Sequence, residues 1–151
     1  MDVNREAPAI AAAEAYIDAP PSVVWSVQSN LREWPAWNSD VASLDVDGPL
    51  APGTEFKWTS GGTPIRSTIQ EVERERRIGW TGRAPLGIRA VHTWTFTPEG
   101  DGTRVRTEES FEGLLVRLFV GPMQKMLDGA LGRSLSALKT EAERRSERGA
   151  A

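Results

Sequence analysis

The chain has 151 residues, a length typical of one domain, and such a domain buries about 68–70% of the surface that its unfolded chain exposes. Hydrophobic residues make up 39% of the sequence and charged residues 26%, which is typical of a soluble globular protein and not of a disordered or membrane-spanning one. The net charge of −3 and the lack of a basic stripe argue against a nucleic-acid-binding surface.

Cysteine is absent and histidine occurs once, so a disulfide framework, a thiolate nucleophile and the usual zinc ligand sets are excluded. We therefore expect neither a metal nor another cofactor. The first 17 residues lack a basic region and Glu14 interrupts their alanine-rich run, so we expect no signal peptide and a cytoplasmic protein. No run approaches the ~20 apolar residues of a membrane span, so we expect no stable membrane insertion. Residues 1–151 are expected to form a single domain, ordered over about 9–148 with frayed ends.

Residues 9–18 are predicted to form the first strand, which a pair of prolines ends. These prolines suit the entry of a short helix in which Val24, Val27 and Leu31 share one face. Trp34 and a second tryptophan three residues later flank a proline, which indicates one further broken turn. The sequence therefore predicts two short helices after the first strand.

From residue 41 onward the pattern changes to short strands separated by turn residues, which is typical of a meander of antiparallel hairpins. The predicted strands cover residues 41–46, 54–60, 65–73, 77–83, 88–97 and 103–113.

After Gly113 the apolar period becomes that of a helix, and Pro122 is expected to start or kink it. Its apolar stripe consists of Met123, Met126, Leu127, Ala130, Leu131, Leu135 and Leu138. The order of elements predicts an α+β fold in which a curved antiparallel sheet grips a long C-terminal helix. The space left between sheet and helix is expected to be a cavity.

Three segments carry a resemblance to a known family: YIDAPPSVVWSVQSNLREWPAWNSDV, HTWTFTPEGDGTRVRTEESFEG and LSALKTEAE. With the order of elements, they resemble the polyketide cyclase/dehydrase-like branch of the START-related (SRPBCC), helix-grip superfamily, whose fold is also that of the birch-pollen allergen. The resemblance covers nearly the whole chain. It implies the fold but not one activity, because the superfamily includes lipid and sterol carriers, plant hormone-binding proteins, aromatic polyketide cyclases and co-chaperones.

The histidine lies on a predicted strand in which inward-facing, mostly apolar residues alternate with outward-facing, mostly polar ones. Inner positions of this strand and the next are Ile88, Ala90, His92, Trp94, Phe96, Val105, Thr107, Glu109 and Phe111. A two-residue type II′ turn at Gly100-Asp101 sets His92 opposite Glu109, with their Cβ atoms about 4.5–5.5 Å apart. The pair is predicted either to act as a general acid and base, or to satisfy each other's polar groups and orient a ligand.

Tryptophan is frequent, with six residues against four phenylalanines and one tyrosine. Three indoles on inner faces are expected to form stacking walls for a planar ligand or to pack as ordinary core. In the resembling family the short helices close one end of the cavity, so Trp34 and Trp37 are candidates for its entrance. The candidate ligand-binding residues are Trp34, Trp37, Phe56, Trp58, Ile69, Trp80, Trp94, Phe96, Thr107, Phe111, Met123, Met126 and Leu127.

These observations predict a protein that binds or carries a hydrophobic small molecule, either aromatic and polycyclic or lipid-like, as a monomer or a homodimer. An alternative is an enzyme similar to polyketide cyclases or dehydratases, with His92 and Glu109 as acid and base. A further alternative is a co-chaperone-like interaction module on the same fold.

Overall fold

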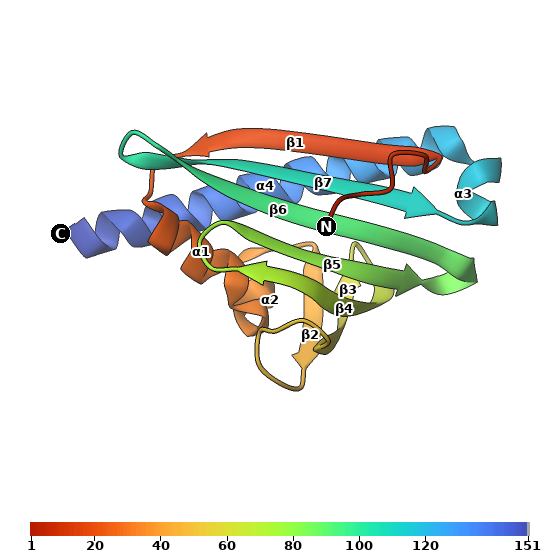
Figure 1. Cartoon of the computed structure of the whole chain (residues 1–151), viewed down its shortest axis with the longest axis horizontal. Coiled ribbons are helices and arrows are strands. Elements are labelled where there is room, and N and C mark those ends of the chain that lie inside the picture. Colours follow the sequence, from red (N-terminus) through yellow and green to blue (C-terminus); the bar gives the residue numbers. More distant parts are fainter. Residues whose placement is uncertain (151) are drawn as a thin grey trace.

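One antiparallel sheet of seven strands dominates the structure, a computed structural model that describes residues 1–150 (Figure 1). Its spatial order is β1-β7-β6-β5-β4-β3-β2, so the first strand pairs with the last and the second strand forms the far edge. The strands are β1 (Ala9–Ile17), β2 (Val41–Val46), β3 (Glu55–Ser60), β4 (Thr63–Glu73), β5 (Arg77–Ala84), β6 (Ile88–Glu99) and β7 (Gly102–Glu112). The predicted meander is confirmed.

Helical segments occur at three places along the chain. After β1 come α1 (Pro21–Ser29), the 3-10 turn η1 (Leu31–Glu33) and α2 (Trp34–Trp37), and between β5 and β6 comes the 3-10 turn η2 (Pro85–Gly87). After β7 the chain forms the short α3 (Leu114–Leu118) and then the long α4 (Val120–Ala150). The short α3 is an element that the sequence patterns did not predict.

Helix α4 lies along the concave face of the sheet and packs mainly on β1 (Figure 1). The inner positions of β1 are alanines except for Ile17, and these small side chains let the helix approach closely, with Ala9 and Ala11 buried against Leu127 and Leu131. Further along the helix, Leu135 and other apolar residues join the larger cluster under α1 and α2. The structure is therefore the helix-grip fold expected from the sequence.

The register between β6 and β7 is the one that the turn chemistry predicts. Glu99 pairs with Gly102, and the two-residue loop between them begins at Gly100 with a positive φ of 57°, a conformation that glycine adopts freely. Along this ladder His92 pairs with Glu109. The predicted register is confirmed, and it aligns the inner faces of the two strands.

The N-terminal segment ahead of β1 covers part of the convex face of the sheet, opposite α4 (Figure 1). Val3 is buried, the Asn4 amide donates to Ser110 Oγ at 3.1 Å, and an Arg5 guanidinium nitrogen lies 2.6 Å from a carboxylate oxygen of Glu108. We expected ordered structure only from about residue 9, so this outer layer adds to the fold that the sequence patterns predict.

Candidate functional site

His92 and Glu109 form a close pair on the concave face of the sheet. Nδ1 of His92 lies 3.1 Å from Oε2 of Glu109, and 8% and 14% of their side-chain surfaces are exposed. Glu109 also pairs across the β1/β7 ladder with Ala11, a strand position that packs under α4. The two titratable side chains therefore meet in the layer between the sheet and the long helix, shielded from bulk water.

Thr107 fixes the orientation of the imidazole from its other side. Its hydroxyl donates to the Thr93 carbonyl oxygen at 3.1 Å and lies 2.8 Å from Nε2 of His92. When the Thr107 hydroxyl gives its one proton to the Thr93 carbonyl oxygen, its oxygen is left to accept a hydrogen bond from a protonated Nε2 of His92. The hydrogen-bond chain thus assigns an Nε2–H imidazole.

The assignment has a consequence for the contact with Glu109. An unprotonated Nδ1 facing an ionised carboxylate at 3.1 Å would bring two lone pairs together, so the contact is attractive only when one of the two groups carries a proton. The contact is short, but its direction does not meet hydrogen-bond geometry, and Nδ1 counts among the buried atoms without a hydrogen-bond partner. His92 and Glu109 are therefore in close contact without a hydrogen bond at Nδ1.

Aromatic rings surround this pair on the concave face. The imidazole lies 4.8 Å from the Trp80 ring and 5.6 Å from the Trp94 ring, centroid to centroid, and is nearly parallel to Trp94 at 30°. Trp80 in turn contacts Trp34 at 5.4 Å and Phe56 at 5.9 Å. A continuous aromatic cluster thus runs from the pair to the short helices.

Several buried polar atoms in and beside this cluster lack a hydrogen-bond partner within residues 1–150. They include the Trp94 and Trp37 indole nitrogens and Oε1 of Gln28, whose backbone oxygen accepts the Trp34 indole N–H at 2.9 Å. Buried indole N–H groups and amide oxygens normally find a partner, such as protein, water or ligand. These atoms place a few unpartnered polar groups in an otherwise apolar interior.

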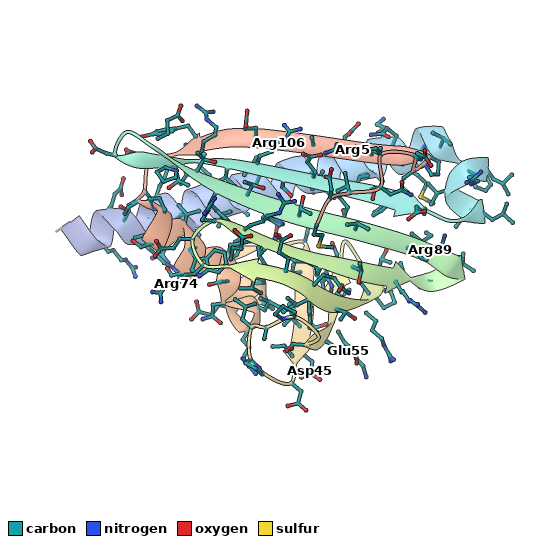
Figure 2. The ribbon with its side chains drawn as sticks, in the orientation of Figure 1. Arg5, Asp45, Glu55, Arg74, Arg89 and Arg106 are labelled. Carbon is teal, nitrogen blue, oxygen red and sulfur yellow. The ribbon has the colours of Figure 1, made fainter. Side chains whose placement is uncertain are left out.

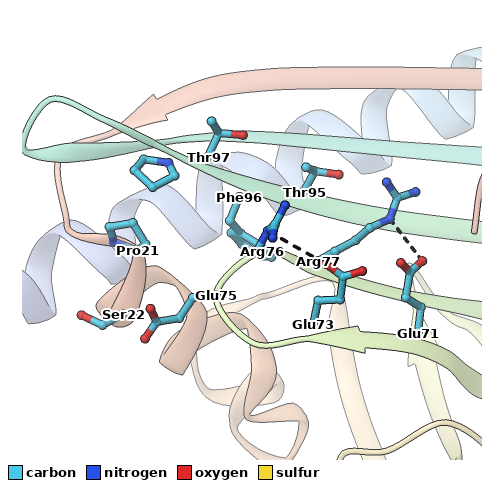
Figure 3. Close-up of a pocket in the computed structure, with 11 residues that line it drawn as sticks. Pro21, Ser22, Glu71, Glu73, Glu75, Arg76, Arg77, Thr95, Phe96 and Thr97 are labelled. Atoms are coloured by element: carbon cyan, nitrogen blue, oxygen red, sulfur yellow. Dashed lines mark ion pairs between the residues drawn. The ribbon is translucent and has the colours of Figure 1, made fainter.

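Neither His92 nor Glu109 lines any of three open cavities on the described part of the molecule. The largest, ≈ 750 Å³, is a groove where α1 meets the β4–β5 turn and the outer part of β6 (Figure 3). Another, ≈ 470 Å³, lies between α2 and α4 and is lined by Trp37. The pair itself is enclosed, with only 6% of His92 exposed.

The predicted ligand-binding residues fall into three groups by burial. Those buried are Trp34, Phe56, Ile69, Trp80, Trp94, Phe96, Thr107 and Leu127. Those half-buried are Trp37, Trp58, Phe111 and Met123. Met126 is 50% exposed and is not part of either buried cluster, because it lies about 100° around the helix from Leu127.

Sequence patterns missed two polar residues of this region. Gln28 is buried on α1, and its helical spacing of four from Val24 could have placed it on the inward face. Ser67 is buried on β4 and accepts the Trp58 indole N–H at 3.0 Å, and its spacing of two from Ile65 and from Ile69 could have placed it on the inner face.

Among residues 1–150, no group of three His, Cys, Asp or Glu side chains is arranged to hold a metal ion. No helix in this range is long and apolar enough to span a bilayer.

Comparison with known proteins adds the family. Residues 8–143 match the sequence model of the family described as polyketide cyclase / dehydrase and lipid transport. No curated protein sequence matches the chain.

Among solved structures, TTHA0849 from Thermus thermophilus is similar with 27% identity and a TM-score of 0.74, over 91% of this chain and 99% of that one. Hypothetical protein jhp0584 from Helicobacter pylori is 14% identical with a TM-score of 0.82, over 91% and 90%. A START superfamily protein from Mycobacterium smegmatis is 16% identical with a TM-score of 0.70, over 92% and 97%.

Proposed function

Because the chain belongs to the polyketide cyclase / dehydrase and lipid transport family, we propose that it binds an aromatic or polycyclic small molecule between the concave face of its sheet and α4. The family and the fold fit hydrophobic ligand binding or cyclase-like chemistry in general. The finer proposal concerns the ligand class and the residues that contact it.

One observation carries the proposal: His92 lies between the rings of Trp80 and Trp94, while the buried Trp94 N–H has no hydrogen-bond partner in the described chain. Small-molecule sites combine apolar and aromatic walls with a few polar groups that fix orientation. An aromatic ligand with carbonyl or hydroxyl oxygens matches this combination, since it can stack on indoles and accept from the Trp94 N–H.

Entry to the concave face requires movement, because the His92–Glu109 pair is enclosed. We propose that the route is the cavity between α2 and α4, where Trp37 is half-buried with an unpartnered indole nitrogen. The part that would move is the end of α2 at Trp37, because Trp34 at its start is held among the rings of Phe56 and Trp80.

Fluorescence titration and native mass spectrometry test this proposal. Flavonoids and polycyclic quinones are expected to quench tryptophan emission and to bind more tightly than roughly 100 μM, about −5.5 kcal/mol. Trp94→Phe should weaken binding several-fold, because phenylalanine keeps a ring but lacks the N–H. Trp25→Phe is the matched control, since Trp25 packs on Phe96 at 5.7 Å and contacts no part of the pair. Failure of every compound in the panel would end the proposal.

A second candidate function is a cyclase or dehydratase, and the 3.1 Å distance between Nδ1 of His92 and Oε2 of Glu109 favours it. Loss of water from a β-hydroxy ketone needs a base for the proton next to the carbonyl and an acid for the departing hydroxyl. A pair of groups that holds one proton can accept the first and return one to the hydroxyl, which leaves as water.

The two functions differ in what His92→Gln and Glu109→Gln change. For an enzyme, each variant should slow turnover of a true substrate by about 10²-fold or more and leave affinity within several-fold. For a carrier, the parent protein releases its ligand unchanged and the variants lose affinity alone.

A further inference from the structure

We propose that one end of the molecule docks reversibly on an anionic lipid surface through an exposed apolar patch. This end patch comprises Leu86 of η2, Leu114 and Leu118 of α3, Phe119, and Val120 and Met126 of α4, which are 78%, 73%, 67%, 51%, 41% and 50% exposed. Single exposed apolar residues are ordinary, but a group of this size on two neighbouring segments marks an interaction site.

Direct contact between backbones holds the two segments together. Gly113, which precedes α3, packs on the η2 turn so closely that an added Cβ would lie 2.7 Å from the Gly87 carbonyl oxygen. Helix α3 also contacts η2, and both lie at the same end of the molecule (Figure 1). The end patch is therefore one surface built from two parts of the chain.

Basic residues outnumber acidic ones around the end patch, with Glu112 and Asp128 at its border. Residues 83–89 and 113–127 contain Arg83, Arg89, Arg117 and Lys125 and no acidic residue. The whole chain has 18 Lys and Arg against 21 Asp and Glu, so outside these segments 14 basic residues stand against 21 acidic ones. Arg89, at this end of the molecule in Figure 2, has one acidic neighbour, Glu112 of β7, at 4.0 Å. The charge distribution would turn this end toward a negative surface.

The backbone conformation of Leu86, the most exposed residue of the end patch, supports a binding role for this residue. Leu86 has φ 65° and ψ 28°, a left-handed conformation that a residue with a Cβ rarely adopts, while its side chain points into solvent. Burial cannot explain why a leucine occupies this position. An unfavourable conformation that presents an apolar side chain indicates a binding function.

The same observations distinguish a lipid surface from other occupants. A twofold dimer through the end patch would bring the basic residues of two copies into one interface, because an isologous interface is made of the same surface from both copies. None of the six apolar residues lines the three cavities described above. Protruding apolar side chains with cations beside them suit the boundary between headgroups and acyl chains.

Vesicle co-sedimentation tests the proposal independently of any ligand in the interior. The protein is expected to bind phosphatidylcholine vesicles containing phosphatidylglycerol at least about tenfold more strongly than phosphatidylcholine alone, and to release them at high salt. Leu118→Ser should lose at least about tenfold in vesicle binding without a change in thermal unfolding, because the side chain is mostly exposed.

Two more variants sharpen the result. Leu86→Gly should weaken vesicle binding while leaving the melting temperature unchanged or higher, since glycine adopts the left-handed conformation freely. Arg74→Gln removes a cation of the distant β4–β5 turn with 86% of its side chain exposed, and should bind vesicles as the parent does.

Absence of binding to anionic vesicles, or equal losses in Arg74→Gln and Leu118→Ser, would overturn the proposal. So would a dimer on size-exclusion chromatography that Leu118→Ser converts to a monomer, because the end patch would then join two copies. Binding to an acidic protein but to no vesicle would assign the patch to a protein partner and would equally contradict a lipid surface.

Discussion

Replacing Thr107 by valine tests the hydrogen-bond chain that orients His92, because valine keeps the shape of threonine and lacks the hydroxyl. Thr107 is fully buried, and its hydroxyl has two partners, the His92 Nε2–H at 2.8 Å and the Thr93 carbonyl oxygen at 3.1 Å. The variant therefore leaves a buried N–H with no acceptor and removes one of the bonds to a carbonyl.

The expected cost follows from these two partners. A buried group left unsatisfied costs about 1–3 kcal/mol, while a carbonyl oxygen has a second lone pair that limits its loss. We expect Thr107→Val to lower the free energy of unfolding by about 2 kcal/mol. With a urea m-value of about 2 kcal/mol/M, the midpoint would fall by about 1 M.

Matched variants and a spectroscopic signal separate this mechanism from a general packing effect. Thr97→Val, on the exposed outer face of β6, should change stability by less than about 0.5 kcal/mol, and Thr107→Ser should keep the hydrogen bonds. Because His92 is the only histidine, its ring nitrogens give unambiguous NMR signals, and Nε2 should carry a proton in the parent protein. A bare Nε2, or equal small effects of the two valine variants, would refute the hydrogen-bond assignment.

Other substitutions test the helix packing and the electrostatics. Leu131→Ala should lower the free energy of unfolding by about 2–5 kcal/mol because Leu131 is 2% exposed, whereas Met126→Ala should cost less than about 1 kcal/mol; similar costs in urea denaturation would contradict the observed helix face. A hydrogen bond from Arg144 lowers the pKa of Glu141 from 4.5 to about 2, so the carboxylate stabilises the fold above about pH 4.5 and this contribution disappears as the pH falls toward 2. Glu141→Gln should therefore cost about 1 kcal/mol at pH 7 and nothing near pH 2 in unfolding experiments, and a cost that is the same at both pH values would exclude the ion pair as its source.

The register of β6 and β7 could be predicted because three signals agreed. The Gly100-Asp101 turn fixed the loop length, each strand alternated cleanly, and a one-residue slip would have put a charged face into the core. Strand alternation and turn chemistry are local properties, so the contact between His92 and Glu109 followed from neighbouring residues alone.

Other features depend on contacts that no local pattern contains. The small alanine side chains at the inner positions of β1 leave room for α4 to pack against this strand. The resulting position of the helix buries Leu127 and leaves Met126 exposed. The helical period predicted an apolar stripe that was too wide by this one residue. The enclosure of His92 also depends on packing, because the Trp80 and Trp94 rings beside it fill the interior. The positions of these rings follow from the three-dimensional fold and not from a local pattern.

The pairing of β1 with β7 has a consequence for how the chain folds during synthesis. Ala9 pairs with Phe111 and Ile17 with Thr103, so this edge of the sheet closes only after nearly a hundred further residues have been made. Helix α4, which covers the same strand, emerges later still. Long-range pairing of this kind slows folding and leaves an unpaired strand exposed in the meantime. Most of β1 is alanine, which has weak β-propensity, and such a composition lowers the tendency of an unpaired strand to aggregate before its partners have been made.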